Sequence, residues 1–241
     1  MLSNLNTNYT KHIYQNSNIV YYYETLTKNI GVIDSEKIII NRFIKENDFV
    51  LDIGCGVGRT TNYIDSICHN VIGVDVSENM ILRAKKLYPN LNFHVQDAID
   101  LKLSQGVFDI VNFSFNGIMT IPGCKNRNKA ILEVHRVLKP NGLFLFSTPF
   151  LDNKRNSEFW LHEKEKYNDS SNYEFGDIFL SDNEVNNIYI HMPELKEISH
   201  LLLNNNFNIL FKKRRLDIVK EDDCIEEYLD DNYCWVAQKN E

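Results

Sequence analysis

The chain has 241 residues, of which 43% are hydrophobic, and its formal net charge is −7. This length suits one domain with a sizeable core, and an acidic chain is repelled by nucleic-acid phosphates. No apolar run reaches the roughly 20 residues that cross a bilayer, and the first residues lack the apolar stretch of a secretion signal. These features predict a single-domain cytoplasmic protein, a monomer or homodimer, that binds neither nucleic acid nor membranes.

Five cysteines are spread along the chain, and none forms a C-x-x-C pair. Most of them stand among apolar residues, which favours buried, reduced thiols over a disulfide framework or a zinc site. The sequence therefore predicts no bound metal.

Residues 1–33 are rich in tyrosine, with Tyr14 and the run Tyr21 to Tyr23 among scattered apolar positions. This composition predicts helices that pack over a ligand site. The next segment, 34–45, opens with acidic and hydroxyl side chains and continues into apolar ones, a pattern typical of a capped helix.

The run FVLDIGCGVG at residues 49–58 predicts a buried strand that ends in a tight turn. Gly54 and Gly56 let the backbone approach a ligand where side chains would clash. A second apolar run ends at Asp75, 21 residues after Gly54. A carboxylate at the tip of that strand can accept hydrogen bonds from both hydroxyls of a ribose, so the two runs together predict a ligand that contains a nucleoside.

Strands and helices continue to alternate as far as Thr148, which is the mark of a parallel sheet covered by helices. A proline then ends the last strand of this series. The elements predicted here are a strand at 91–95, a strand that starts at 108, a helix at 130–138 and a strand at 143–148.

The alternation stops after residue 149. The segment 150–192 is rich in charged and aromatic residues, which predicts an insertion that forms a lid. A helix at 193–205 and strands at 207–211 and 233–237 follow. We divide the single domain into an N-terminal helical cap (1–33), a cofactor-binding core (34–149), the lid insertion (150–192), and a C-terminal helix with a strand pair (193–241).

The glycine-rich turn has two interpretations. A dinucleotide-binding turn needs G-x-G-x-x-G, in which the following helix receives a pyrophosphate at its N-terminus. Gly54 and Gly56 fill the first two places, but Arg59 occupies the third. A NAD-dependent oxidoreductase is therefore the weaker alternative.

The pattern D-x-G-x-G-x-G from Asp52 to Gly58, followed by Asp75, resembles motif I of the class I S-adenosylmethionine-dependent methyltransferases. The stretch ILEVHRVLKPNGLFLFSTP at 131–149 is similar to small-molecule members of that family, and the likeness covers about residues 40–150. The resemblance implies S-adenosylmethionine as the cofactor. The cofactor-binding residues that it implies are Asp52, Gly54, Cys55, Gly56, Asp75, Val76, Met80, Asp97, Ala98, Asn112 and Phe113.

The same resemblance implies a fold. We expect an α/β, Rossmann-like, doubly wound sheet of seven strands in the order 3-2-1-4-5-7-6, with the last strand antiparallel. An N-terminal helical segment precedes the sheet, and the lid insertion follows its fifth strand.

The methyl group of a sulfonium is already activated, so the protein mainly has to hold the acceptor in line, at about 3 Å, and exclude water. An oxygen acceptor also needs a base, whereas an amine only has to be neutral. The family supplies no fixed catalytic residue. We consider His162 and His191 as bases, Tyr22 as a residue that closes on the cofactor, and Asn116 as a group that orients the acceptor. Each of them also has a structural interpretation, and Asn116-Gly117 is a common turn sequence.

The fourth strand continues as Asn112-Phe113-Ser114-Phe115 and lacks the D/N-P-P-Y/F motif of many enzymes that methylate amide or exocyclic nitrogens. We therefore expect methyl transfer to an oxygen or nitrogen of a small polar or aromatic metabolite, such as a precursor of a secondary metabolite or of a cell-surface glycan. The first alternative is a regulatory protein that binds S-adenosylmethionine without catalysis.

Overall fold

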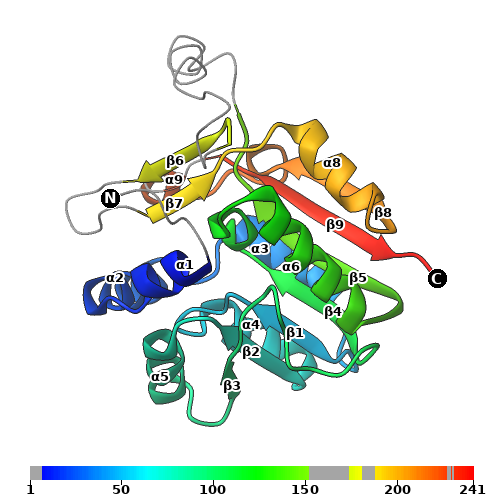
Figure 1. Cartoon of the computed structure of the whole chain (residues 1–241). Helices are drawn as coiled ribbons and strands as arrows, with labels where there is room; N and C mark the ends of the chain where they lie inside the picture. Colours follow the sequence, from blue (N-terminus) through cyan, green and yellow to red (C-terminus); the bar gives the residue numbers. More distant parts are fainter. Residues whose placement is uncertain (1–6, 152–173, 181–187, 227–228, 230) are drawn as a thin grey trace.

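A seven-stranded mixed sheet forms the centre of the molecule (Figure 1). The computed structural model describes residues 7–151, 174–180, 188–226, 229 and 231–241. In the order β3-β2-β1-β4-β5-β9-β8, the strands are Asn92–Val95, Val71–Asp75, Val50–Ile53, Phe108–Phe113, Leu138–Thr148, Tyr233–Lys239 and Phe207–Arg214. Neighbours from β3 to β5 pair in parallel, and β9 is antiparallel to both β5 and β8. This confirms the predicted fold, because β8 and β9 are the sixth and seventh strands of this sheet.

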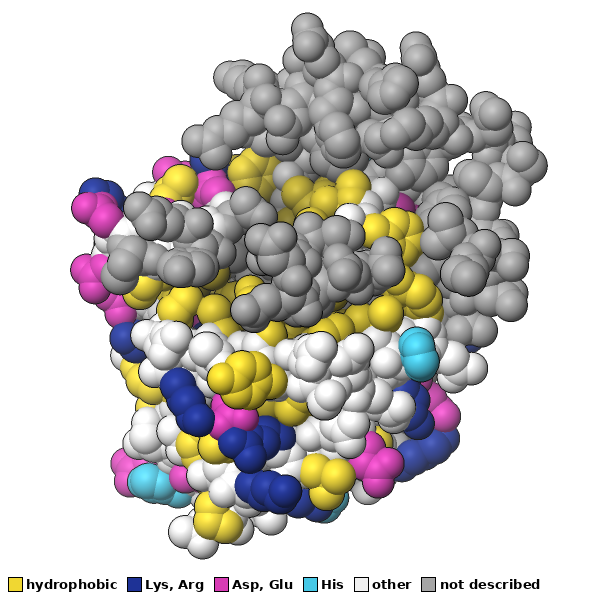
Figure 2. Space-filling view, turned by 90° about the vertical axis from the view of Figure 1, so that its left-hand side faces the viewer, with side chains coloured by type: hydrophobic (Ala, Val, Ile, Leu, Met, Phe, Trp, Pro, Cys, Tyr) yellow, Lys and Arg dark blue, Asp and Glu magenta, His cyan; other side chains and the backbone are white. Residues whose placement is uncertain are grey.

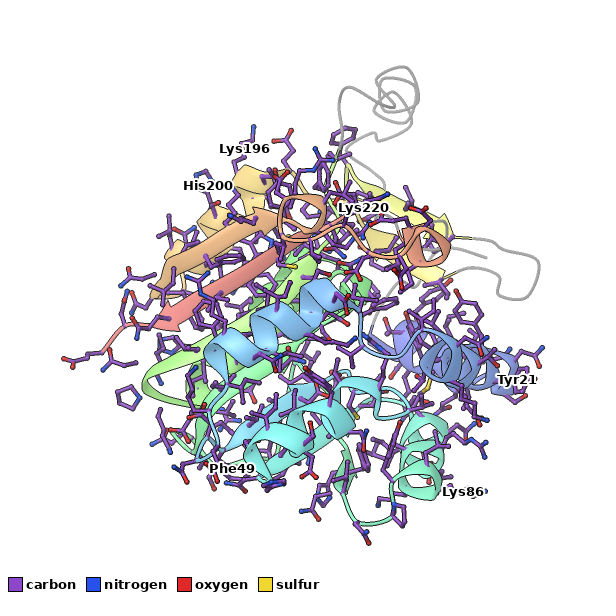
Figure 3. The ribbon with its side chains drawn as sticks, turned by 180° about the vertical axis from the view of Figure 1, so that it is seen from behind. Tyr21, Phe49, Lys86, Lys196, His200 and Lys220 are labelled. Carbon is purple, nitrogen blue, oxygen red and sulfur yellow. The ribbon has the colours of Figure 1, made fainter. Side chains whose placement is uncertain are left out.

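Helices cover both faces of the sheet. In the view of Figure 1, α6 and α8 lie on the near face, and Figure 3 shows α3 and α4 on the opposite one. None of the helices in the described ranges is long and apolar enough to cross a bilayer. The α-helices are α1 (Thr7–Tyr14), α2 (Ser17–Asn29), α3 (Asp34–Phe43), α4 (Arg59–Cys68), α5 (Glu78–Leu87), α6 (Cys124–Val137), α8 (Leu195–Leu203) and α9 (Asp223–Glu226), with short 3₁₀ helices η1 (Gly117–Thr120) and η2 (Arg215–Asp217).

The central strands are buried on both faces, which explains their continuous apolar runs. Leu51 and Val111 have no exposed surface, and they belong to the core between the sheet and helices α6 and α8. Val50 belongs to a second core that includes Ile40 of α3 and Ile64 of α4. These two cores fix β1 and β4 at the middle of the sheet.

Helices α1 and α2 pack over one end of the sheet, as predicted for the N-terminal segment (Figure 1). The buried carboxylate of Glu24 pairs with Arg83 of α5, and its pKa falls to about 2 because Arg83 and then Lys28 donate hydrogen bonds to it. The Ser77 hydroxyl donates to the Tyr14 carbonyl at 2.7 Å. The cap is therefore fixed to the loop that follows β2.

A separate two-stranded antiparallel sheet, β6 (Asp177–Leu180) and β7 (Ile188–His191), lies in the segment predicted as a lid. Phe179 packs edge-on against Tyr9 of α1, with 6.1 Å between ring centroids. Much of the predicted 150–192 insertion, including His162, lies outside the described residues. Its role as a lid remains a prediction.

The two predicted starts that differ most from the structure are those of α6 and β5. Helix α6 begins at Cys124 instead of residue 130, because its polar first turns lack the apolar periodicity that predicts a helix. Strand β5 begins at Leu138 instead of residue 143, although it contains a proline and a glycine, and its register against β4 shifts between Phe108 and Ile110.

Candidate functional site

A pocket opens between the N-terminal helices and the carboxyl ends of β1, β2 and β4. It encloses about 1050 Å³, open mouth included, which is large enough for a nucleoside cofactor and a small second ligand. Nine of the eleven predicted cofactor residues line it. They are Gly54, Cys55, Gly56, Asp75, Val76, Met80, Asp97, Ala98 and Phe113.

The glycine loop after β1 forms one wall of this pocket. Gly54 and Gly56 both have positive φ angles, of 62° and 55°. A Cβ at Gly54 would lie 2.7 Å from a ring carbon of Phe113, whereas a Cβ at Gly56 would meet no atom within 4 Å. Gly54 is thus required for packing beneath the loop, and Gly56 presents bare backbone to the pocket.

Asp52 lies under the loop and does not line the pocket. It is fully buried and accepts hydrogen bonds from the hydroxyls of Thr60 and Thr61, at 2.8 and 2.6 Å, and from the Asn112 side-chain amide at 2.7 Å. Burial raises its pKa, while these hydrogen bonds act in the opposite direction. Asp52 and Asn112 therefore join β1, β4 and α4 below the loop, and neither reaches the pocket where direct cofactor contact was predicted.

Asp75 is fixed by two backbone groups. Its Oδ2 accepts from the Gly56 N–H at 3.0 Å, and its Oδ1 accepts from the Ser77 N–H at 2.8 Å. Burial raises the pKa of Asp75 to about 6, although both N–H groups oppose the shift. The carboxylate keeps further acceptor capacity on the pocket side, as a ribose partner requires.

Asp97 and Ala98 follow β3 and line the same pocket, where the resemblance predicts contact with an adenine. Asp97 Oδ1 accepts from the Ile99 N–H at 3.1 Å, which fixes this turn. Cys55 also lines the pocket, but burial raises the pKa of its thiol well above the ordinary value. A protonated thiol is a weak nucleophile, so Cys55 is suited to packing.

Arg59 is a pocket residue that the sequence did not predict as functional. Its guanidinium forms two hydrogen bonds with the Glu36 carboxylate, one of them at 2.9 Å, and donates to the Gly31 carbonyl at 3.2 Å. It also lies 4.8 Å from the centroid of the Phe115 ring. Arg59 stands where a dinucleotide-binding turn has its third glycine, and here it ties the cofactor loop to α3.

Two tyrosines of the N-terminal cap line the pocket, but Tyr22 does not. Tyr14 and Tyr23 lie with ring centroids 5.9 Å apart, and burial raises the pKa of both phenols. Tyr22 packs in the same apolar cluster as these two tyrosines, with Ile19 and Met80, but does not line the pocket. Figure 3 shows Tyr21, the first member of the run, projecting outward from α2. The predicted Tyr22 is therefore replaced at the pocket by Tyr23, its neighbour in the run.

Asn116 has a φ angle of 62° and immediately precedes η1, which fits the turn interpretation. Its N–H donates to the Ser147 hydroxyl at 2.9 Å. Its side-chain oxygen is buried without a hydrogen-bond partner among the described residues. Phe115 and Gly117, on either side of it, line the pocket, whereas Asn116 does not. A role in orienting the acceptor remains a prediction.

His191 lies away from the pocket lining and is 1% exposed. Its ring nitrogens face Asp177 Oδ1 at 2.7 Å and Glu197 Oε2 at 3.2 Å. A base must reach the acceptor with a free lone pair, so this geometry disagrees with the predicted catalytic role of His191. Glu174, Asp177 and His191 offer three possible metal ligands within 4.8 Å of one another, but Arg127 already pairs with Glu174, as expected of a charge-paired cluster.

Comparison with known proteins agrees with this site. Residues 51–146 match the family model of a methyltransferase domain. An uncharacterised protein of Methanocaldococcus jannaschii is 38% identical over 125 residues, which are 52% of this chain and 46% of that protein. The phosphoethanolamine N-methyltransferase of Plasmodium falciparum is 27% identical over 199 residues, 77% of this chain and 74% of that enzyme.

The solved structures agree on the fold. A crystal structure of an S-adenosylmethionine-dependent methyltransferase from Methanosarcina mazei aligns with a TM-score of 0.67 and 24% identity, covering 84% of this chain and 97% of that one. The chain spans less than half the length of the first curated relatives that it matches. Residues 51–146 therefore carry a methyltransferase domain, and the sheet order and the glycine loop that faces Asp75 are those expected of the class I S-adenosylmethionine-dependent methyltransferase family, whose cofactor is S-adenosylmethionine.

Proposed function

We propose that the protein transfers the methyl group of S-adenosylmethionine to an oxygen or nitrogen of a small polar or aromatic metabolite. The observation that carries this proposal is the hydrogen bond between Asp75 and the Gly56 N–H at the edge of the pocket. This bond holds a hydrogen-bond acceptor for ribose hydroxyls and an open stretch of backbone on one wall of the pocket. Both are features that a nucleoside cofactor needs.

The residues fit the cofactor in three places. Asp75 would accept from the ribose hydroxyls, the Gly54 to Gly56 backbone would face the amino-acid end, and Asp97 with Ala98 would contact the adenine. When bound, S-adenosylmethionine supplies a methyl group already activated by its sulfonium. The chain itself would orient the methyl acceptor and exclude water, and the partly buried rings of Tyr14 and Tyr23 support that task.

The remaining lining supports a small acceptor. Thr10, Thr27 and Thr120 line the pocket together with the apolar Leu26 and Ile121. Figure 2 looks onto this end of the molecule, where hydrophobic side chains gather and Lys and Arg side chains are interspersed with Asp and Glu. The Plasmodium relative, by its name, methylates a nitrogen of a small polar molecule. Mixed surface charge and a relative of this kind favour a metabolite over a nucleic acid as the acceptor.

The neutral phenols bear on how an oxygen acceptor would lose its proton. Because burial raises the pKa of both Tyr14 and Tyr23, their hydroxyls stay protonated near neutral pH. They are poor bases under these conditions. An amine acceptor, which needs only to be presented neutral, suits this wall better than an alcohol.

Methyl transfer from labelled S-adenosylmethionine tests the proposal. Purified protein would be incubated with a panel of small amines, phenols and sugars and with a metabolite extract, and release of S-adenosylhomocysteine would be followed. We expect release that depends on an acceptor, is lost in Asp75→Ala and is kept in Asp223→Ala, whose side chain is 87% exposed and belongs to α9. Binding of S-adenosylhomocysteine with no label in any product would support the non-catalytic alternative.

A further inference from the structure

A buried polar network joins the β6–β7 sheet to the wall of the pocket. Its members are Arg127 of α6, Glu174, Asp177 of β6, Tyr189 and His191 of β7, and Glu197 of α8. Arg127, Asp177, Tyr189 and His191 are each at least 96% buried. Burial of so many charged groups is costly unless they pair, so the pairing must be examined in detail.

His191 is held between two carboxylates that come from different elements. Its Nδ1 faces Asp177 Oδ1 at 2.7 Å, and its Nε2 faces Glu197 Oε2 at 3.2 Å. A carboxylate oxygen only accepts, and a neutral imidazole carries a single N–H. Both contacts are therefore hydrogen bonds only when His191 is an imidazolium.

Asp177 also accepts from the Tyr189 hydroxyl at 2.6 Å and from the Glu174 N–H at 2.8 Å. Among the described residues, the other cation facing this cluster is Arg127, which donates to the Tyr189 hydroxyl at 3.2 Å and pairs with Glu174. Loss of the His191 proton removes one positive charge from the cluster and leaves one ring nitrogen of His191 with no proton to donate to its carboxylate.

The network reaches both sides of the pocket. Arg127 donates to the Ile121 carbonyl at 3.3 Å, and Ile121 lines the pocket. On the other side, Ile188 of β7 packs in the cluster that contains Tyr14 and Tyr23. The β6–β7 sheet thus contacts η1 and the N-terminal helices at once.

We propose that this network is a protonation-dependent clamp, which holds the β6–β7 sheet on the pocket walls and opens when His191 loses its proton. Burial, the largest single influence, lowers the pKa of His191, but the hydrogen bonds to Asp177 and Glu197 outweigh it and the pKa is raised. A raised pKa in the closed state stabilises closure fully below the ordinary pKa of histidine. This stabilisation is lost as the pH rises through the closed-state pKa.

Hydrogen exchange at pH 6 and pH 9, corrected for intrinsic exchange rates, tests the clamp. We expect protection of the 174–180 and 188–192 amides to fall as the pH rises from the ordinary pKa of histidine to the raised pKa of His191 in the closed state, by up to about tenfold per pH unit. The amides of β1 and β4 should stay protected. His191→Gln should show low protection at both pH values. His200→Gln is the matched control, because His200 lies on the outer face of α8 (Figure 3) and should behave as the wild type.

Equal protection of wild-type β6 and β7 at both pH values, or loss of protection throughout the large sheet, would overturn the clamp. Should His191→Gln fail to fold, the ¹⁵N spectrum of the wild-type ring decides, because the clamp requires two protonated ring nitrogens at pH 6 and a neutral ring at that pH contradicts it. These measurements need no acceptor. One further consequence, slower methyl transfer at alkaline pH, rests on the proposed function. Binding of S-adenosylhomocysteine separates the two proposals, because it tests the cofactor site and does not depend on the clamp.

Discussion

The carboxylate of Asp75 accepts a hydrogen bond from the backbone N–H of Gly56, with 3.0 Å between oxygen and nitrogen. The two residues come from different strand ends, and the bond makes the glycine loop and the tip of β2 one rigid wall. A second bond, from the Ser77 N–H, fixes the other carboxylate oxygen. The Ser77 hydroxyl in turn holds the Tyr14 carbonyl of the N-terminal cap. The wall and the cap are thus positioned by one short chain of hydrogen bonds.

Replacement of Asp75 by alanine should weaken binding of S-adenosylhomocysteine by about 1.5–3 kcal/mol, or roughly 10- to 150-fold, because a charge-assisted acceptor is removed. Calorimetric titration measures this directly. Asp223→Ala, on the exposed surface of α9, serves as the control and should bind as the wild type. Wild-type affinity in a folded Asp75→Ala protein would place the ribose elsewhere.

Cofactor binding should weaken in acid. Burial raises the pKa of Asp75 to about 6, and the ionised carboxylate is the stronger acceptor. The association constant should therefore be highest above pH 6 and fall as the pH drops through that value, approaching about tenfold per pH unit. Titrations between pH 5 and pH 7.5 check this, because S-adenosylhomocysteine has no group of its own that titrates there. In Asp75→Asn the slope should disappear.

Gly56→Val should abolish cofactor binding with a moderate loss of stability. Gly106→Val is the matched control, because the φ angle of Gly106, 66°, is also positive and a Cβ there also meets no atom within 4 Å. Both variants carry similar backbone strain, of order 1–3 kcal/mol, but only position 56 faces the pocket. Thermal unfolding and calorimetry together separate the two effects. Equal cofactor affinity in both variants would contradict the assignment of this loop.

The pair Arg59 and Glu36 should be important for stability. Their side chains are only 11% and 9% exposed, so Arg59→Met leaves a buried carboxylate unpaired and should cost about 3–5 kcal/mol in the free energy of unfolding. The double variant Arg59→Met/Glu36→Leu should recover most of this loss. Urea denaturation measures both, with Lys102→Ala, which breaks an exposed pair with Asp100, as a control expected to cost at most about 1 kcal/mol. If Arg59→Met lowers the free energy of unfolding no more than the control does, the pair of Arg59 and Glu36 is not important for stability.

Much of the fold was predictable because its signals are local. The apolar runs before Gly54 and Asp75 mark buried strands by composition alone, and parallel strands bring their carboxyl ends to one edge of the sheet. The cofactor side of the pocket follows from these two facts. Asp52 and Asn112 carry the same signal but lie below the loop, since a sequence pattern does not distinguish a residue that touches the ligand from one that supports it.

The part of the pocket that would hold the methyl acceptor was less predictable, because its residues are brought together by tertiary contacts. Of three consecutive tyrosines on one helix, only Tyr23 lines the pocket, and no local pattern in the sequence shows which of them will do so. The sequence presents Arg59 only as the residue that breaks a glycine motif, because its partner Glu36 is 23 residues away. His191 resembled a catalytic base, and its two carboxylate partners become neighbours only in the folded chain.

Calorimetric titration of the wild-type protein with S-adenosylhomocysteine and with NADH, each at pH 7.5, tests whether this pocket binds S-adenosylmethionine. We expect saturable one-to-one binding of S-adenosylhomocysteine and much weaker binding of NADH, because Arg59 replaces the third glycine of a dinucleotide-binding turn. Saturable binding of NADH with no response to S-adenosylhomocysteine would contradict this expectation.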